Sequence, residues 1–150
     1  MLVRFKPLDV DHIERYLRRV ESIPLNRRPI WGGMDATQMF AHLRRSIELA
    51  LGDYPEPDRS TWVTRLAGKI MHSPLPWPRG MKSPGYFFPE THEGEPERRM
   101  LLATMQKFVR EVKENPNRTV ASPLFGPLTM QQWTKFMGRH FEHHLRQFDV

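Results

Sequence analysis

Three histidines lie within five residues near the end of the chain, at positions 140, 143 and 144. In an α-helix, side chains four residues apart share one face, with Cβ atoms about 5–6 Å apart. His140 and His144 could therefore bind one metal ion through two imidazole nitrogens. His143 is rotated by about 100° from His144 on the helix and does not easily reach the same ion. The spacing makes His140 and His144 the candidate ligand pair and places His143 beside them.

His42 is a third candidate ligand, on a different predicted helix. Like His140 and His144 it falls on an apolar stripe, and a buried imidazole costs free energy unless it is hydrogen-bonded or liganded. Two histidines from one helix and one from another would form a three-coordinate face that leaves a position for water or a substrate. The pattern alone leaves two interpretations open: a metal site, or histidines that are hydrogen-bonded in the core.

Several other kinds of site are excluded by the residues present. The chain has no cysteine, which excludes disulfides, a thiol nucleophile, iron–sulfur clusters and thiolate zinc sites. Glu142 follows His140 by two positions, whereas the metalloprotease pattern H-E-x-x-H needs the Glu directly after the first His. The sequence contains no phosphate-binding P-loop and no G-x-S-x-G pattern. The remaining histidines have polar or loop contexts and are expected at the surface: His12, His72 and His92.

Four long helices are predicted to position these histidines, over residues 9–22, 35–51, 96–114 and 129–148. In each of them apolar side chains recur every three to four residues, which is the spacing of one buried helix face. Two of the helices begin with the sequence of a capping box: Asp35 with Gln38, and Thr129 with Gln132. No segment has a strong strand pattern. We therefore expect an all-α fold, a four-helix bundle with a long Pro-rich connection between the second and third long helices.

The connection over residues 53–96 holds eight of the 14 prolines. A short helix is predicted at 60–71, with Trp62, Leu66 and Ile70 on one side. The stretch SPLPWPRGMKSPGYFFPE cannot form a regular helix or a central strand. A loop of this length either crosses over and covers the helices or shapes the mouth of a pocket. Its aromatic residues available for packing are Trp77, Tyr86, Phe87 and Phe88.

Length and charge limit the class of protein. A chain of 150 residues is expected to form a single domain over residues 1–150. The formal net charge is +6, but the basic residues are scattered among acidic ones, which is typical of solvated helix faces rather than of a nucleic-acid-binding surface. The N-terminus has no apolar signal region, and no run approaches 18 apolar residues. We expect a cytoplasmic protein with no membrane segment and no nucleic-acid partner.

Two segments resemble the DinB/YfiT-like superfamily of metalloenzymes, specifically a branch catalogued as a domain of unknown function. They are SPLFGPLTMQQWTKFMGRHFEHHLRQF near the C-terminus and MDATQMFAHLRRSIELALG in the second predicted helix. The H-H-x-x-Q ending of the superfamily's last helix is matched by His143, His144 and Gln147. In many members an arginine directly follows the second histidine, whereas here Leu145 does and Arg146 comes next.

The resemblance implies a long-loop four-helix bundle that binds a divalent metal, usually zinc or nickel, through three histidines. One comes from the second helix and two, four residues apart, from the last; by position these are His42, His140 and His144. It also implies a small-molecule substrate. In the thiol-dependent transferases and isomerases of the superfamily, the metal binds a low-molecular-weight thiol as its thiolate.

We therefore expect a metal-dependent enzyme, either a thiol-dependent transferase or a hydrolase. Hydrolysis would need a carboxylate base near the metal, and none lies on the histidine stripes, which favours thiol chemistry. The alternative is a metal-binding or stress-response module without turnover. Exposed helix faces would allow a homodimer. The candidates for holding an anionic co-substrate are Arg44, Arg45, Arg139 and Arg146.

Overall fold

The computed structural model describes residues 5–71, 73, 77–79 and 93–150. Its helices are α1 (Ile13–Ser22), α2 (Ala36–Leu51), α3 (Trp62–Met71), α4 (Gly94–Glu114) and α5 (Met130–Gln147). Its strands are β1 (Thr119–Ser122) and β2 (Gly126–Thr129), which lie between α4 and α5. Each predicted helix is present, and the ends differ from the prediction by a few residues. Helix α1 differs most, because the Asp9 carboxylate accepts the N–H groups of Asp11 and His12 in a turn before the helix begins.

Helices α2 and α5, which carry the candidate ligands, both begin with the predicted capping box. The Asp35 carboxylate accepts the Gln38 N–H at 2.8 Å, and the Gln38 side-chain oxygen accepts the Asp35 N–H at 2.9 Å. Thr129 and Gln132 form the equivalent pair of hydrogen bonds at 3.1 and 2.9 Å. Each box satisfies two backbone N–H groups at a helix start. The boxes thereby fix where each histidine-bearing helix begins.

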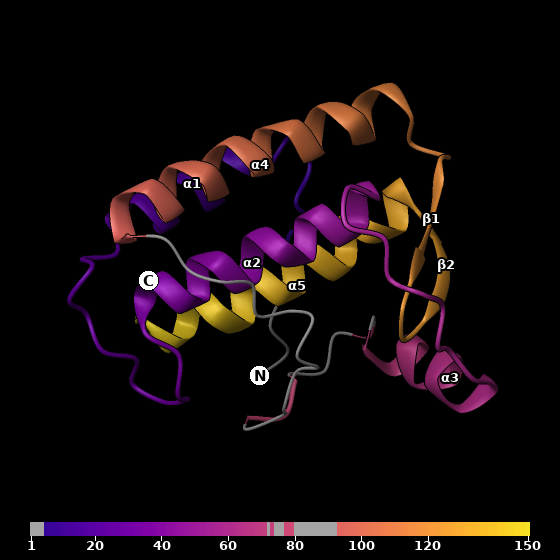
Figure 1. The fold of residues 1–150 in the computed structure, drawn as a ribbon, viewed down its shortest axis with the longest axis horizontal. Helices are drawn as coiled ribbons and strands as arrows, with labels where there is room; N and C mark the ends of the chain where they lie inside the picture. The colour runs from indigo at the N-terminus through magenta and orange to yellow at the C-terminus, as the bar shows by residue number, and fades with distance from the viewer. Residues whose placement is uncertain (1–4, 72, 74–76, 80–92) are drawn as a thin grey trace.

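The helices pack in two layers. Figure 1 shows α2 and α5 side by side, with α4 and α1 running along their upper side. The predicted stripe of each long helix faces this interior and is buried. The stripe residues are Ile13, Leu17 and Val20 of α1; Met39, His42, Leu43, Ser46, Leu49 and Ala50 of α2; Leu101, Met105, Phe108 and Val112 of α4; and Trp133, Met137, His140 and His144 of α5, followed by Gln147 or Phe148. The two candidate ligand segments therefore belong to one layer and face each other within it.

The predicted all-α four-helix bundle is wrong. The described residues contain five helices and an antiparallel two-stranded sheet, which makes the fold a mixed α/β one. Residues 119–122 pair with 126–129 in a hairpin, and Gly126 closes its turn at φ 76°, in the left-handed region that favours glycine. Each strand has only four residues, and Pro127 lies in β2, so the alternation that identifies a strand never develops.

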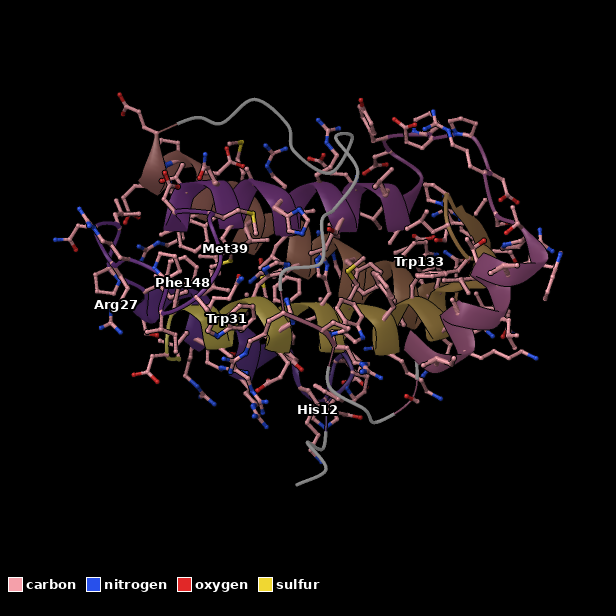
Figure 2. All side chains as sticks on the ribbon, turned by 90° about the horizontal axis from the view of Figure 1, so that it is seen from below. His12, Arg27, Trp31, Met39, Trp133 and Phe148 are labelled. Carbon is pink, nitrogen blue, oxygen red and sulfur yellow. The ribbon has the colours of Figure 1, made fainter. Side chains whose placement is uncertain are left out.

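The hairpin closes one end of the α2–α5 layer. The Trp133 indole N–H of α5 donates to the Val120 carbonyl at 3.2 Å, and Arg118, which precedes β1, donates to the Leu51 carbonyl at the end of α2 at 2.8 Å. Figure 2 shows Trp133 toward this end of α5, whereas Trp31 lies across α5 farther along the helix. The hairpin therefore joins the two histidine-bearing helices at the end away from Trp31.

Helix α3 is present where a helix was predicted, but its apolar face is not buried. Trp62, Leu66 and Ile70 are exposed by 79%, 53% and 61%. In Figure 1 the helix lies below the hairpin, outside the two layers. Within the described residues, no helix is long and apolar enough to cross a membrane. The predictions for five residues of the Pro-rich connection fall outside the described part of the chain: His72, Tyr86, Phe87, Phe88 and His92.

Gly138 allows the N-terminal segment to lie directly against α5. A Cβ atom at this position would collide with the Lys6 carbonyl oxygen and lie 2.9 Å from the Pro7 Cα. The Tyr16 hydroxyl group secures the contact, since it lies 2.5 Å from the Lys6 carbonyl and 3.2 Å from the Gly138 carbonyl. Gly138 therefore admits a close neighbour that a larger residue would exclude.

Candidate metal centre

The structure brings His42, His140 and His144 together, although 98 positions of sequence separate the first two. His42 comes from the middle of α2 and the other two from the C-terminal half of α5. All three are buried, with exposed fractions of 1%, 5% and 6%. Their ligand nitrogens lie within 4.8 Å of one another, which is close enough to bind one metal ion.

The nitrogens converge through their Nε2 atoms. The Nε2 atom of His140 lies 2.9 Å from that of His42 and 3.1 Å from that of His144. For metal–nitrogen bonds of about 2.05 Å, these separations correspond to angles of about 90–100° at the metal. Three protein ligands leave at least one position of a four-coordinate ion for water or a substrate. The donor set therefore fits a divalent cation with an open coordination position.

Gln147 orients one of the three rings. Its side-chain oxygen lies 2.7 Å from Nδ1 of His144 and accepts the Nδ1–H hydrogen bond. The neutral ring then carries its lone pair on Nε2, the atom that faces the other two histidines. Ligating histidines commonly donate their other N–H to such an acceptor, which fixes the tautomer and the ring orientation. At His140 the outer nitrogen Nδ1 has no hydrogen-bond partner among the described residues.

Burial keeps the imidazoles of His140 and His144 neutral. Burial lowers the pKa of His140 and His144 well below the usual value, and the neighbouring histidines lower it further. A neutral imidazole offers a lone pair to a metal, whereas an imidazolium does not. Burial also lowers the pKa of His143, and Arg79 adds to the effect. At neutral pH the site therefore presents metal ligands that need not first lose a proton.

Aromatic rings cover the outer side of the histidine cluster. The Trp77 ring lies 5.8 Å from the ring of His140, and the Phe136 ring lies 5.7 Å from it. His143 packs edge-on against both His144, at 5.0 Å, and Trp31, at 4.9 Å. Trp77 packs on α5, as expected of a connection that covers the helices, and also lines the adjacent cavity, as expected of one that shapes a pocket mouth. His143 lies beside the three converging nitrogens, not among them.

A cavity of about 110 Å³ lies next to the cluster. Its lining includes Trp77 and His143, which contact the cluster, and Trp31, which packs on His143. The charged residues of the lining are three arginines and one acid: Arg79, Arg139, Arg146 and Glu142. Three guanidinium groups against one carboxylate make this cavity cationic. Such a lining favours a ligand that carries a negative charge.

The four arginines named from the sequence separate into two groups. Arg44 forms ion pairs with Glu97 and Glu48 at 2.5 and 2.7 Å, and Arg45 stacks on a tyrosine ring at 3.6 Å. Neither of them lines the cavity beside the histidines. Arg139 and Arg146 do line it, and burial lowers the pKa of Arg139 to about 10. The candidates for an anionic co-substrate therefore reduce to Arg139 and Arg146.

Glu142 points away from the three nitrogens, as its position two residues after His140 predicts. Its two oxygens accept from Arg19 at 2.7 Å and from Arg146 at 2.9 Å. Burial alone would raise the pKa of this carboxyl group, but the two arginines outweigh burial and lower it. The carboxylate is therefore occupied by ion pairs and poorly suited to take a proton from a substrate.

Three contributors to the site were not identified from the sequence: Trp31, Arg79 and Phe136. The loop that carries Trp31 is held by Gln147, whose backbone carbonyl accepts the Ile30 N–H at 2.7 Å. Gly32 adopts φ 87°, and a Cβ there would lie 2.5 Å from the Gln147 amide nitrogen. The glycine pair after Trp31 was the available signal, because it marks a sharp turn next to an aromatic residue.

A comparison with known protein families identifies the family of this chain. The family model described as "Protein of unknown function (DUF1569)" matches residues 4–150, and the chain belongs to this family. No curated protein and no solved structure matches the chain. The match agrees with the domain-of-unknown-function part of the resemblance and provides no link to the DinB/YfiT-like superfamily.

Proposed function

We propose that this protein is a metal-dependent enzyme whose divalent cation is bound by His42, His140 and His144. The observation that carries the proposal is the convergence of three buried Nε2 atoms, with separations of 2.9 and 3.1 Å from the central one. A hydrogen on one of three facing nitrogens can donate a good hydrogen bond to only one of the other two, whereas a cation can accept a lone pair from all three. Zinc or nickel is the cation we propose, because imidazole suits both.

For the reaction we propose thiol-dependent group transfer, the chemistry that the resemblance to the DinB/YfiT-like superfamily implies. A divalent cation lowers the pKa of a bound thiol or water and so supplies a nucleophile at neutral pH. Trp77 and Phe136 exclude water from the outer side of the histidines. Arg139 and Arg146 line the adjacent cavity and orient the negative charge of a small-molecule substrate.

Hydrolysis is disfavoured because the cavity lacks an available carboxylate base. Among the described lining residues Glu142 is the one acid, and its oxygens are held by Arg19 and Arg146. A general base must be within hydrogen-bond reach of the proton it removes and must be able to accept it. A thiol that loses its proton on binding to a cation needs no such carboxylate.

A non-catalytic metal-binding module is the second candidate. It is favoured by the burial of the ligands, none of which is more than 6% exposed. In a structural site the fourth position is closed by a protein ligand, whereas in a catalytic site it exchanges with solvent or substrate. A thiol that displaces solvent from the metal would therefore support the enzyme, and a centre unaffected by any thiol would support the module.

The first test is metal content. We expect elemental analysis of the purified protein to find close to one divalent ion per chain. His140→Ala and His144→Ala should each abolish metal binding while circular dichroism shows the helices retained. His12→Ala, which removes a histidine paired with Asp9 at 2.6 Å, is the matched control, and His143→Ala should also retain the ion. Metal that persists in both His140→Ala and His144→Ala would refute the assignment.

The second test distinguishes the two functions. The cobalt(II)-substituted protein is mixed with glutathione or cysteine, and with their S-methylated forms as controls. Thiolate-to-metal charge-transfer absorption that the free thiols produce, and the methylated forms do not, would support thiol chemistry.

We also propose a homodimer formed through exposed helix faces, which light scattering of the purified chain would measure.

A further inference from the structure

A second cavity lies where α3, the hairpin and the first turns of α5 meet. Its volume is about 500 Å³, which lies within the range of small-molecule sites. It shares no lining residue with the cavity beside the histidines. The residues that matter for its chemistry are Arg65 and Lys69 of α3, Phe125 and Leu128 of the hairpin, and Gln132 and Lys135 of α5.

The charged groups of this cavity all have one sign. Arg65, Lys69 and Lys135 come from two different helices, and no acid is among the lining residues. Within the part of the chain that the structure describes, neither lysine forms an ion pair. The Arg65 Nε atom donates to the Ser60 hydroxyl at 2.9 Å, and its guanidinium group forms an ion pair with Asp58 at 3.4 Å, so the two lysines are the cations that carry the argument. The cavity therefore favours an anion.

The wall formed by the hairpin is apolar. Phe125 and Leu128 face the cavity from the hairpin, and Leu128 is buried. Two glycines let α3 approach this wall. A Cβ at Gly68 would lie 2.9 Å from the Phe125 ring, and one at Gly126 would lie 2.8 Å from Arg65 Nε. A ligand that satisfies both walls has an anionic group and an apolar body.

We propose that this cavity is a binding site for a small organic anion, a phosphate monoester or a carboxylate attached to an apolar body. The anionic group contacts Lys69, Lys135 and Arg65, and the apolar body packs on Phe125. Gln132 supplies a polar side chain that can hydrogen-bond the anion. This site is separate from the proposed metal centre, because Phe136 lies between them: its ring is 5.8 Å from that of Phe125 and 5.7 Å from that of His140.

The test measures binding of phenyl phosphate and benzoate by isothermal titration calorimetry. Inorganic phosphate and phenol are the comparison probes, because each carries only one half of the proposed chemistry. We expect phenyl phosphate or benzoate to bind with a saturable isotherm and at least tenfold more tightly than either half. Their relative affinities tell a phosphate-bearing ligand from a carboxylate. Equal binding of inorganic phosphate would overturn the apolar part of the proposal, and no binding of either probe would overturn the whole of it.

The location is tested with charge-matched variants. Lys69→Gln/Lys135→Gln should weaken binding at least tenfold. Arg110→Gln/Lys113→Gln, which removes two exposed cations from α4, is the control and should leave binding unchanged. Unchanged affinity in the lysine variant would overturn the assignment. His140→Ala and chelator-treated protein should bind as the untreated protein does, and loss of binding in either would assign the ligand to the metal centre instead.

Discussion

Gln147 should determine how tightly the metal binds, although it does not touch the metal position. Its side-chain oxygen accepts from Nδ1 of His144 at 2.7 Å, and both residues are buried. In Gln147→Met the side chain keeps a similar length but loses the acceptor, and water cannot replace it there. Nδ1–H then loses its partner, and the tautomer with the lone pair on Nε2 is no longer favoured.

The size of the expected loss in metal affinity follows from the role of the group that accepts the outer N–H of a ligating histidine. Removing the hydrogen-bond partner of a ligating histidine typically costs tenfold to hundredfold in metal affinity, or about 1.4–2.7 kcal/mol. The metal-free protein should also be destabilised, because a buried N–H without a partner costs about 1–3 kcal/mol. Gln147→Glu retains an oxygen acceptor and should recover most of the affinity that Gln147→Met loses.

The assay is competition for zinc against a chromophoric chelator, combined with urea denaturation of the metal-free protein. Gln131→Met, on the exposed side of the first turn of α5, is the control for the substitution itself. The reasoning is refuted if Gln147→Met binds zinc as tightly as the unchanged protein. It is also refuted if Gln147→Glu is as weak as Gln147→Met, because the side chain would then act through packing and not as an acceptor.

Two further predictions concern the stability of the fold. Gly138→Ala should lower the free energy of unfolding, measured by urea denaturation, by up to about 2 kcal/mol, because overpacking against Lys6 costs about 1–3 kcal/mol and the gain in helix propensity is about 1 kcal/mol. The control is Gly33→Ala, because a Cβ atom there meets nothing within 4 Å. Equal effects of the two substitutions would contradict the close approach at Gly138. For the metal-free protein, burial lowers the folded-state pKa of His140 and His144, so the unfolded chain binds more protons below about pH 6.5. The free energy of unfolding should then fall with acid by up to about 2.7 kcal/mol per pH unit, and His140→Gln/His144→Gln should lack that slope.

The sequence by itself determined the local features of the site. The spacing of His140 and His144 places both on one face of α5, because a helix repeats every 3.6 residues wherever it packs. The capping boxes at Asp35 and Thr129 fixed where α2 and α5 begin, since a cap involves only residues three apart. The apolar stripes of the long helices were likewise readable, because burial of one face imposes a period on the sequence.

Only the tertiary structure decided which distant residues meet. No local pattern encodes that His42 lies 2.9 Å from His140, because that distance depends on how α2 docks against α5. The same holds for Trp77 and Phe136, which cover the cluster, and for the choice of Arg139 over Arg44 as a cavity residue. The hairpin was missed because its four-residue strands are too short to show an alternation of buried and exposed side chains. Contacts with the helices, such as the hydrogen bond from Trp133 to Val120, stabilise its pairing instead.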